Sequence, residues 1–160
     1  MTYIPGAIAE AKSSVLDRIP KDTPIHIVRT RWNPEIVNAL VSGCRAQLEK
    51  RGMTHVVETT VSGCFELPYA AKIAIEKKAA AVVAIGVLIK GSTPHFDYIA
   101  DATTHGLMKV QLTAGAPVIF GVLTCNTKDQ AEARAGIAPD SHNHGTDWAD
   151  AALEQIALRY

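Results

Sequence analysis

The sequence predicts an α/β protein in which helices cover both faces of a four-stranded parallel sheet. Four apolar runs, at 25–28, 56–61, 79–89 and 118–123, alternate with segments of helical periodicity. Each connection is long enough for a helical crossover, which parallel strands require. The run at 79–89 lacks polar alternation, as expected of a strand buried on both faces. We therefore expect one domain over 25–160, because a chain of 160 residues can bury a single core.

Residues 1–24 precede this domain as an arm. Pro5-Gly6 and the cluster from Pro20 to Pro24 interrupt regular structure, and a short helix is predicted around residues 8–16. Such an arm is either disordered or packed on a neighbouring subunit.

The first strand begins at Ile25 and is followed by a helix. Asn33 is a favourable N-cap, Pro34 suits the first helical position, and Gly52 suits the helix end. The helix carries an apolar stripe: Val37, Leu40, Val41, Cys44 and Leu48. The second strand, 56–61, contains polar residues, which indicates a place nearer the sheet edge. A second helix follows Pro68 and carries Ala70, Ile73 and Ala74.

The central strand, 79–89, leads into a short turn and a third helix. Thr93 is predicted to cap this helix, Pro94 to be its first residue, and His95 to lie in its first turn. Free N–H groups and the helix dipole make such an end attractive to anions. Similar junctions also occur in α/β proteins that bind nothing there. The helix stripe is Phe96, Ile99, Thr103, Leu107, Val110 and Ala114.

The last strand, 118–123, is followed by two helices. Thr127 to Gln130 form a capping-box pattern, with Arg134 in the last turn of a short helix and Gly136 just past its end. Residues 137–145 form a polar loop. The final helix is predicted to begin at Trp148 and to bury Ala149, Ala152, Leu153, Ile156 and Tyr160.

Composition excludes several classes of partner. Sixteen basic residues balance sixteen acidic ones, which gives no electrostatic attraction to nucleic acid or anionic membranes. The three cysteines are widely spaced, which indicates a reducing compartment rather than a disulfide framework or a zinc knuckle. No export signal is visible, and the longest apolar run is too short to span a bilayer. We expect a cytoplasmic protein.

In a doubly wound sheet, ligands bind beyond the carboxyl ends of the strands. The residues at these ends are Trp32 with Asn33, then 63–66, then 90–95, then 124–126 with Phe120 and Arg134 nearby. These residues form the predicted site.

The chain resembles the lumazine synthase family from about Ile25 onward. The resemblance rests on five motifs in order: Arg31-Trp32-Asn33, Gly63 to Pro68, Gly86 to Phe96, Pro117 to Thr124, and Gln130-Ala131 with Arg134-Ala135-Gly136. It implies a flavodoxin-like three-layer αβα sandwich. It also implies condensation of 5-amino-6-(D-ribitylamino)uracil with 3,4-dihydroxy-2-butanone 4-phosphate to give 6,7-dimethyl-8-ribityllumazine, the penultimate step of riboflavin biosynthesis, without a metal or organic cofactor.

The resemblance assigns one group of residues to the pyrimidine and its ribityl chain. Trp32 would stack on the ring, and Glu66 would bind ribityl hydroxyls. Cys64 would be a small wall residue, with its backbone and those of Leu88 and Ile89 on the uracil edge. The full set is Trp32, Asn33, Gly63, Cys64, Phe65, Glu66, Val87, Leu88, Ile89 and Phe120. Without the family, Trp32 is more simply an interface or core residue, Asn33 a helix cap and Glu66 a surface carboxylate.

A second group would handle phosphate and protons. Ser92 and Thr93 would bind the substrate phosphate, and Arg134 would complete that site, although a cation also suits a helix C-terminus. His95 is the candidate acid/base, because a histidine can accept and donate protons near neutrality. His144 is the fourth phosphate-binding residue that the resemblance implies. It stands where many relatives have a Lys near the phosphate, and since a histidine is only partly cationic at neutral pH, its share in binding would be smaller.

The family supplies Phe120 from an adjacent subunit, which implies a homo-oligomer with shared active sites. The loop before His142 looks slightly longer than in shell-forming relatives, which favours a pentamer over an icosahedral shell of twelve pentamers. Three alternatives remain: a flavin- or lumazine-binding protein without catalysis, a structural cage subunit, and a metal site formed by His142, His144 and Cys125. The metal site lacks the further ligands that zinc requires.

Overall fold

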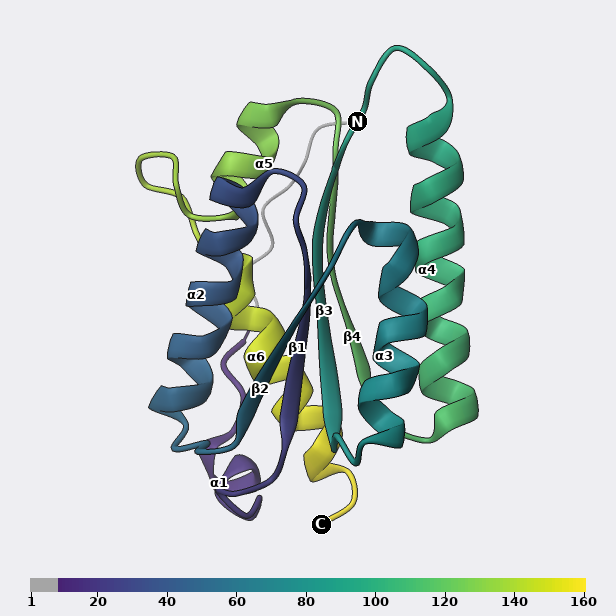
Figure 1. The fold of residues 1–160 in the computed structure, drawn as a ribbon. Coiled ribbons are helices and arrows are strands. Elements are labelled where there is room, and N and C mark those ends of the chain that lie inside the picture. Colours follow the sequence, from purple (N-terminus) through teal and green to yellow (C-terminus); the bar gives the residue numbers. More distant parts are fainter. Residues whose placement is uncertain (1–8) are drawn as a thin grey trace.

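The structure is a computed structural model of the chain and describes residues 9–160. Its four strands form one parallel sheet in the order β2-β1-β3-β4, with helices on both faces (Figure 1). The predicted three-layer α/β architecture is confirmed. The elements are α1 Ser13–Leu16, β1 Ile25–Thr30, α2 Pro34–Lys50, β2 Val56–Val61, the 3₁₀ turn η1 Cys64–Glu66, α3 Leu67–Glu76, β3 Ala81–Ile89, α4 His95–Ala114, β4 Val118–Cys125, α5 Lys128–Arg134 and α6 His144–Ala157.

Each face of the sheet has its own apolar core. On one face α2 and α6 pack on each other and on the sheet, with α1 and α5 beside them; on the other face lie α3 and α4 (Figure 1). The predicted α2 stripe is buried throughout, from Val37 to Leu48. The core of the α3–α4 face centres on Val28, Leu67, Val82 and Leu107.

The positions of β3 and β2 in the sheet agree with their apolar content. The apolar strand β3 lies between β1 and β4, and Ala81 to Val87 are buried. The more polar β2 lies at one edge, as its composition predicts, and its Glu58 bonds Arg45 at 2.9 Å. Central strands lose water on both faces, so they must be apolar, whereas an edge strand keeps contact with water.

Three helix ends lie where glycine or threonine predicted them. Gly52 and Gly136 have φ of 82° and 72°, a region that L-residues avoid, and they follow α2 and α5. Thr127 caps α5 by accepting a hydrogen bond from the Gln130 N–H at 3.3 Å. The side chain of Gln130 accepts from the N–H of Asn126, one residue before the cap.

The predicted starts of α4 and α6 are wrong, as is the predicted burial of Tyr160, whereas α2 begins at Pro34 as predicted. Asn33 occupies the N-cap of α2 in a left-handed conformation, φ 50°, but makes no side-chain capping bond. Helix α4 begins at His95 with Pro94 as its cap, one residue later than predicted, so Thr93 caps nothing. Helix α6 begins at His144 rather than Trp148, because the side chain of Asn143 caps it by accepting from the Gly145 N–H. Tyr160 is exposed beyond its end.

The predicted N-terminal helix is also shorter than expected. Helix α1 covers only Ser13–Leu16, and Ile8 lies outside the described residues. Within residues 9–160, no helix is both long and apolar enough to cross a bilayer.

Helix α6 is held tightly against α2. A Cβ on Gly145 would lie 2.0 Å from the carbonyl oxygen of Leu40, so only glycine fits there. The Asn143 side chain donates to the Ala39 carbonyl at 2.8 Å. Farther along, the Asp150 carboxylate accepts two bonds from Arg51, at 2.9 and 2.8 Å, and two from Gln47 at 3.0 Å. These contacts fix where His144 lies.

Candidate active site

The carboxyl end of β3 extends past its neighbour β1. Pairing with β1 stops at Ile85, whereas pairing with β4 continues to Ile89. Within residues 9–160, β3 therefore has no partner strand on the β1 side beyond Ile85. Backbone groups alternate sides along a strand, and the Lys90 N–H donates to the Cys125 carbonyl of β4 at 2.9 Å. Val87 and Ile89 consequently present their backbone groups toward β1, and Leu88 presents its own toward β4.

Trp32 follows β1 beside this exposed edge. Its side chain is 70% exposed, and with Arg31, Asn33, Pro34 and Ser62 it lines a shallow hollow. Because most of the Trp32 side chain is exposed to solvent, a flat heteroaromatic ring can stack on its indole.

The side chains of Trp32 and Glu66 both lie close to Gly63. A Cβ on Gly63 would lie 3.2 Å from Glu66 Oε2 and 3.4 Å from Trp32 Cδ1. The carboxylate and the indole therefore flank the same backbone atom. This arrangement brings together three residues that the sequence placed on two different strand ends. Phe65, between them in η1, is 61% exposed.

Cys64 forms part of the wall behind this group. Its side chain is buried, and a Cβ on Gly86 would lie only 2.6 Å from its sulfur. Burial raises the pKa of the Cys64 thiol to about 12, while the N–H of Val87, which donates to the sulfur, acts in the opposite direction. A thiol held neutral in this way is a poor nucleophile, which agrees with the wall role. The Cys64 carbonyl accepts from the Leu67 N–H and from the hydroxyl of Thr103 at 3.2 Å, so the predicted uracil contact falls to its N–H group.

Ser92, Thr93 and His95 lie at the junction between β3 and α4. All three are exposed, and His95 is the first residue of this helix of 20 residues. The N-terminal N–H groups of such a helix attract an anion. A phosphate, two hydroxyls and an imidazole can therefore meet at one helix end.

Arg134 lies across the sheet from this junction, on α5. Its guanidinium donates to the Gln130 carbonyl at 3.2 Å and acts electrostatically on both Cys125 and His144. Burial lowers the pKa of His144, and His142 and Arg134 lower it further, against the opposing effect of Asp147. His144 Nδ1 lies 3.7 Å from Asp147 Oδ2, an oxygen that His142 Nε2 also approaches at 2.8 Å.

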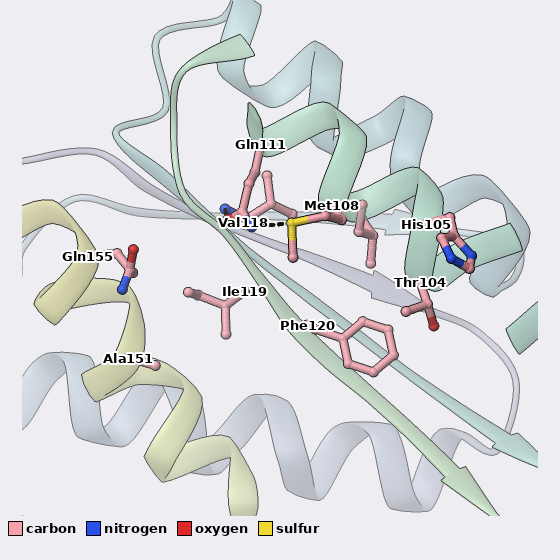
Figure 2. Close-up of a pocket in the computed structure, with 10 residues that line it drawn as sticks. Thr104, His105, Met108, Gln111, Val118, Ile119, Phe120, Ala151 and Gln155 are labelled. Carbon is pink, nitrogen blue, oxygen red and sulfur yellow. Dashed lines mark hydrogen bonds between the residues drawn. The ribbon is translucent and has the colours of Figure 1, made fainter. Parts of the chain in front are cut away.

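Phe120 lies apart from the other predicted residues. Phe120 lies on the edge strand β4, where it pairs with Ala84. The last pair of these strands, Ile89 with Cys125, is five residues farther on, so Phe120 lies about 17 Å from the carboxyl end of β4. Its ring is 40% exposed. It lines a groove between β4, α4 and α6, with Thr104, His105 and Met108 on one side and Ala151 and Gln155 on the other (Figure 2). One chain does not bring Phe120 to Trp32.

The residues predicted from the sequence omit some that line the site and one that lies buried behind it. Arg31 and Ser62 line the hollow beside Trp32, and their place next to predicted residues was the available signal. Thr103 is completely buried within an apolar helical stripe, where a hydroxyl needs a partner. Among residues 9–160, no group of three or more His, Cys, Asp or Glu side chains has the arrangement to hold a metal ion.

Comparisons with known proteins agree with this geometry. The family model described as 6,7-dimethyl-8-ribityllumazine synthase matches residues 22–159. Proteins of that name from Pyricularia oryzae, Kineococcus radiotolerans and Schizosaccharomyces pombe are 42%, 46% and 45% identical to this chain. The matches cover 84%, 84% and 81% of this chain and 87%, 84% and 84% of the respective relatives. The chain belongs to the 6,7-dimethyl-8-ribityllumazine synthase family.

Proposed function

We propose that this protein condenses 5-amino-6-(D-ribitylamino)uracil with 3,4-dihydroxy-2-butanone 4-phosphate to form 6,7-dimethyl-8-ribityllumazine, with loss of phosphate and water. This is the penultimate step of riboflavin biosynthesis. The observation that carries the proposal is the unpaired backbone edge of β3 beyond Ile85, with the exposed indole of Trp32 and the carboxylate of Glu66 beside it. A uracil needs these groups: a flat surface, backbone donors and acceptors for its edge, and a carboxylate for the attached hydroxyls.

On the pyrimidine side, each group has a distinct task. The N–H of Ile89 and its carbonyl face the open edge, whereas the Val87 N–H is directed at Cys64 Sγ. Ile89 is therefore the main backbone contact for the uracil. Glu66 accepts hydrogen bonds from the ribityl chain, and a bond to a charged acceptor is about twice as strong as a neutral one.

On the phosphate side, the β3–α4 junction receives the second substrate. Ser92 and Thr93 offer hydroxyls and N–H groups to the phosphate, and His95 stands next to them on the first turn of α4. Formation of the Schiff base requires proton transfer to the departing water, and enolisation requires removal of a proton before phosphate leaves. His95 performs both transfers, since one imidazole can take and give a proton.

Arg134 supplies the fixed positive charge for the phosphate, since a guanidinium stays protonated at all working pH values. His144 contributes less than a lysine would, because its pKa is lowered by burial and by the neighbouring His142 and Arg134. The site therefore depends more heavily on Arg134 than a site with two permanent cations would.

We further propose that the active protein is a cytoplasmic homopentamer with sites shared between subunits. Two features of one chain support this. Phe120 lies on the outer edge of β4, too far along the strand to cover a ring stacked on its own Trp32. The groove beside it is lined by the apolar side chains of Met108, Val118 and Ile119 (Figure 2), as a surface that packs against a neighbour would be.

The test is a condensation assay with purified protein and both substrates, following lumazine absorbance and released phosphate. We expect a rate well above the spontaneous reaction. His95→Ala should lower kcat by a factor of about 10² to 10⁴ without abolishing product formation, because orientation of two substrates continues to accelerate the reaction. A folded oligomer that binds lumazine without accelerating its formation would contradict the proposal and favour a binding protein.

A further inference from the structure

Thr103 is a polar residue in the core between α4 and the sheet. Its exposed fraction is 0%, and it occupies a helical stripe whose next buried member is Leu107. Its hydroxyl donates to the carbonyl of Cys64 at 3.2 Å. This bond joins α4, which begins with His95, to the turn η1, which belongs to the pyrimidine half of the site.

Two further contacts hold the same turn. The side chain of Cys64 packs closely on β3, where a Cβ on Gly86 would lie 2.6 Å from its sulfur, so the residue is held through both its backbone and its side chain. At the start of α3, Pro68 packs against Gly106 of α4, where a Cβ would lie 2.8 Å from the proline ring. Glycine is unfavourable inside a helix relative to alanine, and here its absence of a side chain permits the close approach. The turn is thus fixed from β3 and from α4.

The position of the turn determines the position of Glu66. Glu66 is the last residue of η1, and its carboxylate and the Trp32 indole both flank Gly63. A shift of the turn would change how the carboxylate lies relative to the indole. Displacements of about 1 Å are enough to impair a site far from the change itself.

We propose that Thr103 is a positioning residue for the pyrimidine half of the active site, acting through the Cys64 carbonyl on Gly63 and Glu66. The inference rests on the proposed function for the identity of the ligand. Thr103 itself contacts neither substrate. Its hydroxyl fixes the position of the turn η1, and the position of the turn determines the affinity for the ribitylaminouracil.

Loss of this hydroxyl should weaken pyrimidine binding selectively. In Thr103→Val the shape of the side chain is kept, but the Cys64 carbonyl retains only the Leu67 N–H as a partner. One buried hydrogen bond corresponds to about a fivefold change in an equilibrium constant. We therefore expect the Kd for 5-amino-6-(D-ribitylamino)uracil to rise about fivefold. The KM for the butanone phosphate should stay within about twofold, because Ser92, Thr93 and Arg134 do not depend on η1.

The experiment measures binding of 5-amino-6-(D-ribitylamino)uracil alone, through quenching of tryptophan fluorescence, for the wild type, Thr103→Val and Thr103→Ser. Serine keeps the hydroxyl, so it should restore the wild-type Kd to within about twofold. Thr113→Val is the matched control, since Thr113 is exposed on the same helix and its hydroxyl bonds the Lys109 carbonyl at 2.7 Å. That control should bind the pyrimidine normally.

An unchanged Kd in folded Thr103→Val would overturn the proposal, and so would equal losses for both substrates. If Thr103→Val does not fold, Thr103→Ala and Thr103→Ser replace it, because these two differ only by the hydroxyl; equal affinities for the pyrimidine in the two would refute the role. Failure of the proposed function gives a different result, because the wild-type protein itself would then not accelerate the condensation, whatever the Thr103 variants bind.

Discussion

Replacement of Gly86 by alanine should destabilise the protein, chiefly through a clash with the sulfur of Cys64. Gly86 lies in β3, and a Cβ there would stand 2.6 Å from Cys64 Sγ, 3.1 Å from Thr30 Cγ2 and 3.4 Å from Leu67 Cδ1. The sulfur must retreat by roughly 1 Å to reach ordinary van der Waals distance. It is buried and bonded to the Val87 N–H, so it cannot move into open space.

Overpacking of this kind costs about 1–3 kcal/mol of unfolding free energy. The value should be measured by denaturant unfolding at one fixed protein concentration, because self-association changes the apparent stability. Gly91→Ala is the matched control, since a Cβ on Gly91 would meet nothing within 4 Å. Its stability should lie within about 0.5 kcal/mol of the wild type.

The double variant Gly86→Ala with Cys64→Ala isolates the contact. Removing the sulfur opens the space that the new methyl group needs, so the double variant should be at least about 1 kcal/mol more stable than the sum of the single effects predicts. Additive effects, or a Gly86→Ala protein as stable as the wild type, would show that the sulfur does not limit this position. We also expect Gly86→Ala to raise the KM for the pyrimidine, because a displaced Cys64 moves the turn that carries Glu66.

Three further outcomes are expected. Arg134→Ala should raise the KM for the phosphate substrate at least about tenfold more than that for the pyrimidine; steady-state kinetics with equal effects on both would contradict its role. Phe120→Ala should weaken pyrimidine binding while sedimentation still finds the wild-type oligomer, and an unaltered affinity would remove Phe120 from the site. Burial raises the pKa of Asp150, but bonds from Arg51 and Gln47 outweigh it and lower the pKa overall. Asp150→Ala should therefore cost about 1–3 kcal/mol at neutral pH, and this difference should shrink as pH falls below about 4 and through the folded-state pKa; a pH-independent difference in unfolding titrations would refute the account.

Local features of the sequence were sufficient for the order and type of the elements. The apolar run that became β3 lies in the centre of the sheet, and the polar residues of β2 placed it at the edge. Gly52, Gly136 and Thr127 mark helix ends as predicted. These features depend on side-chain chemistry and backbone preference within a few residues, and both can be read along the chain.

Boundaries that depend on tertiary contacts were misjudged. Asn33 occupies the N-cap of α2 as predicted, but at φ 50° its side chain makes no capping bond. Helix α6 begins at His144 rather than Trp148, because Asn143 caps it while bonding Ala39 on α2. The bond from Asn143 to Ala39 joins segments that are distant in sequence, so no local pattern reveals it.

The same division holds for the site. That candidate ligand-binding residues gather beyond the strand ends follows from the α/β pattern, and the sequence alone proposed Trp32, Glu66 and His95 among them. Only the tertiary structure shows that β3 extends beyond its pairing with β1 and that Thr103 donates to the Cys64 carbonyl. It also shows that Phe120 lies about 17 Å along β4 from the carboxyl end of that strand. Strand register and helix docking are set by how whole faces pack together, and such packing is decided among residues that the sequence places far apart.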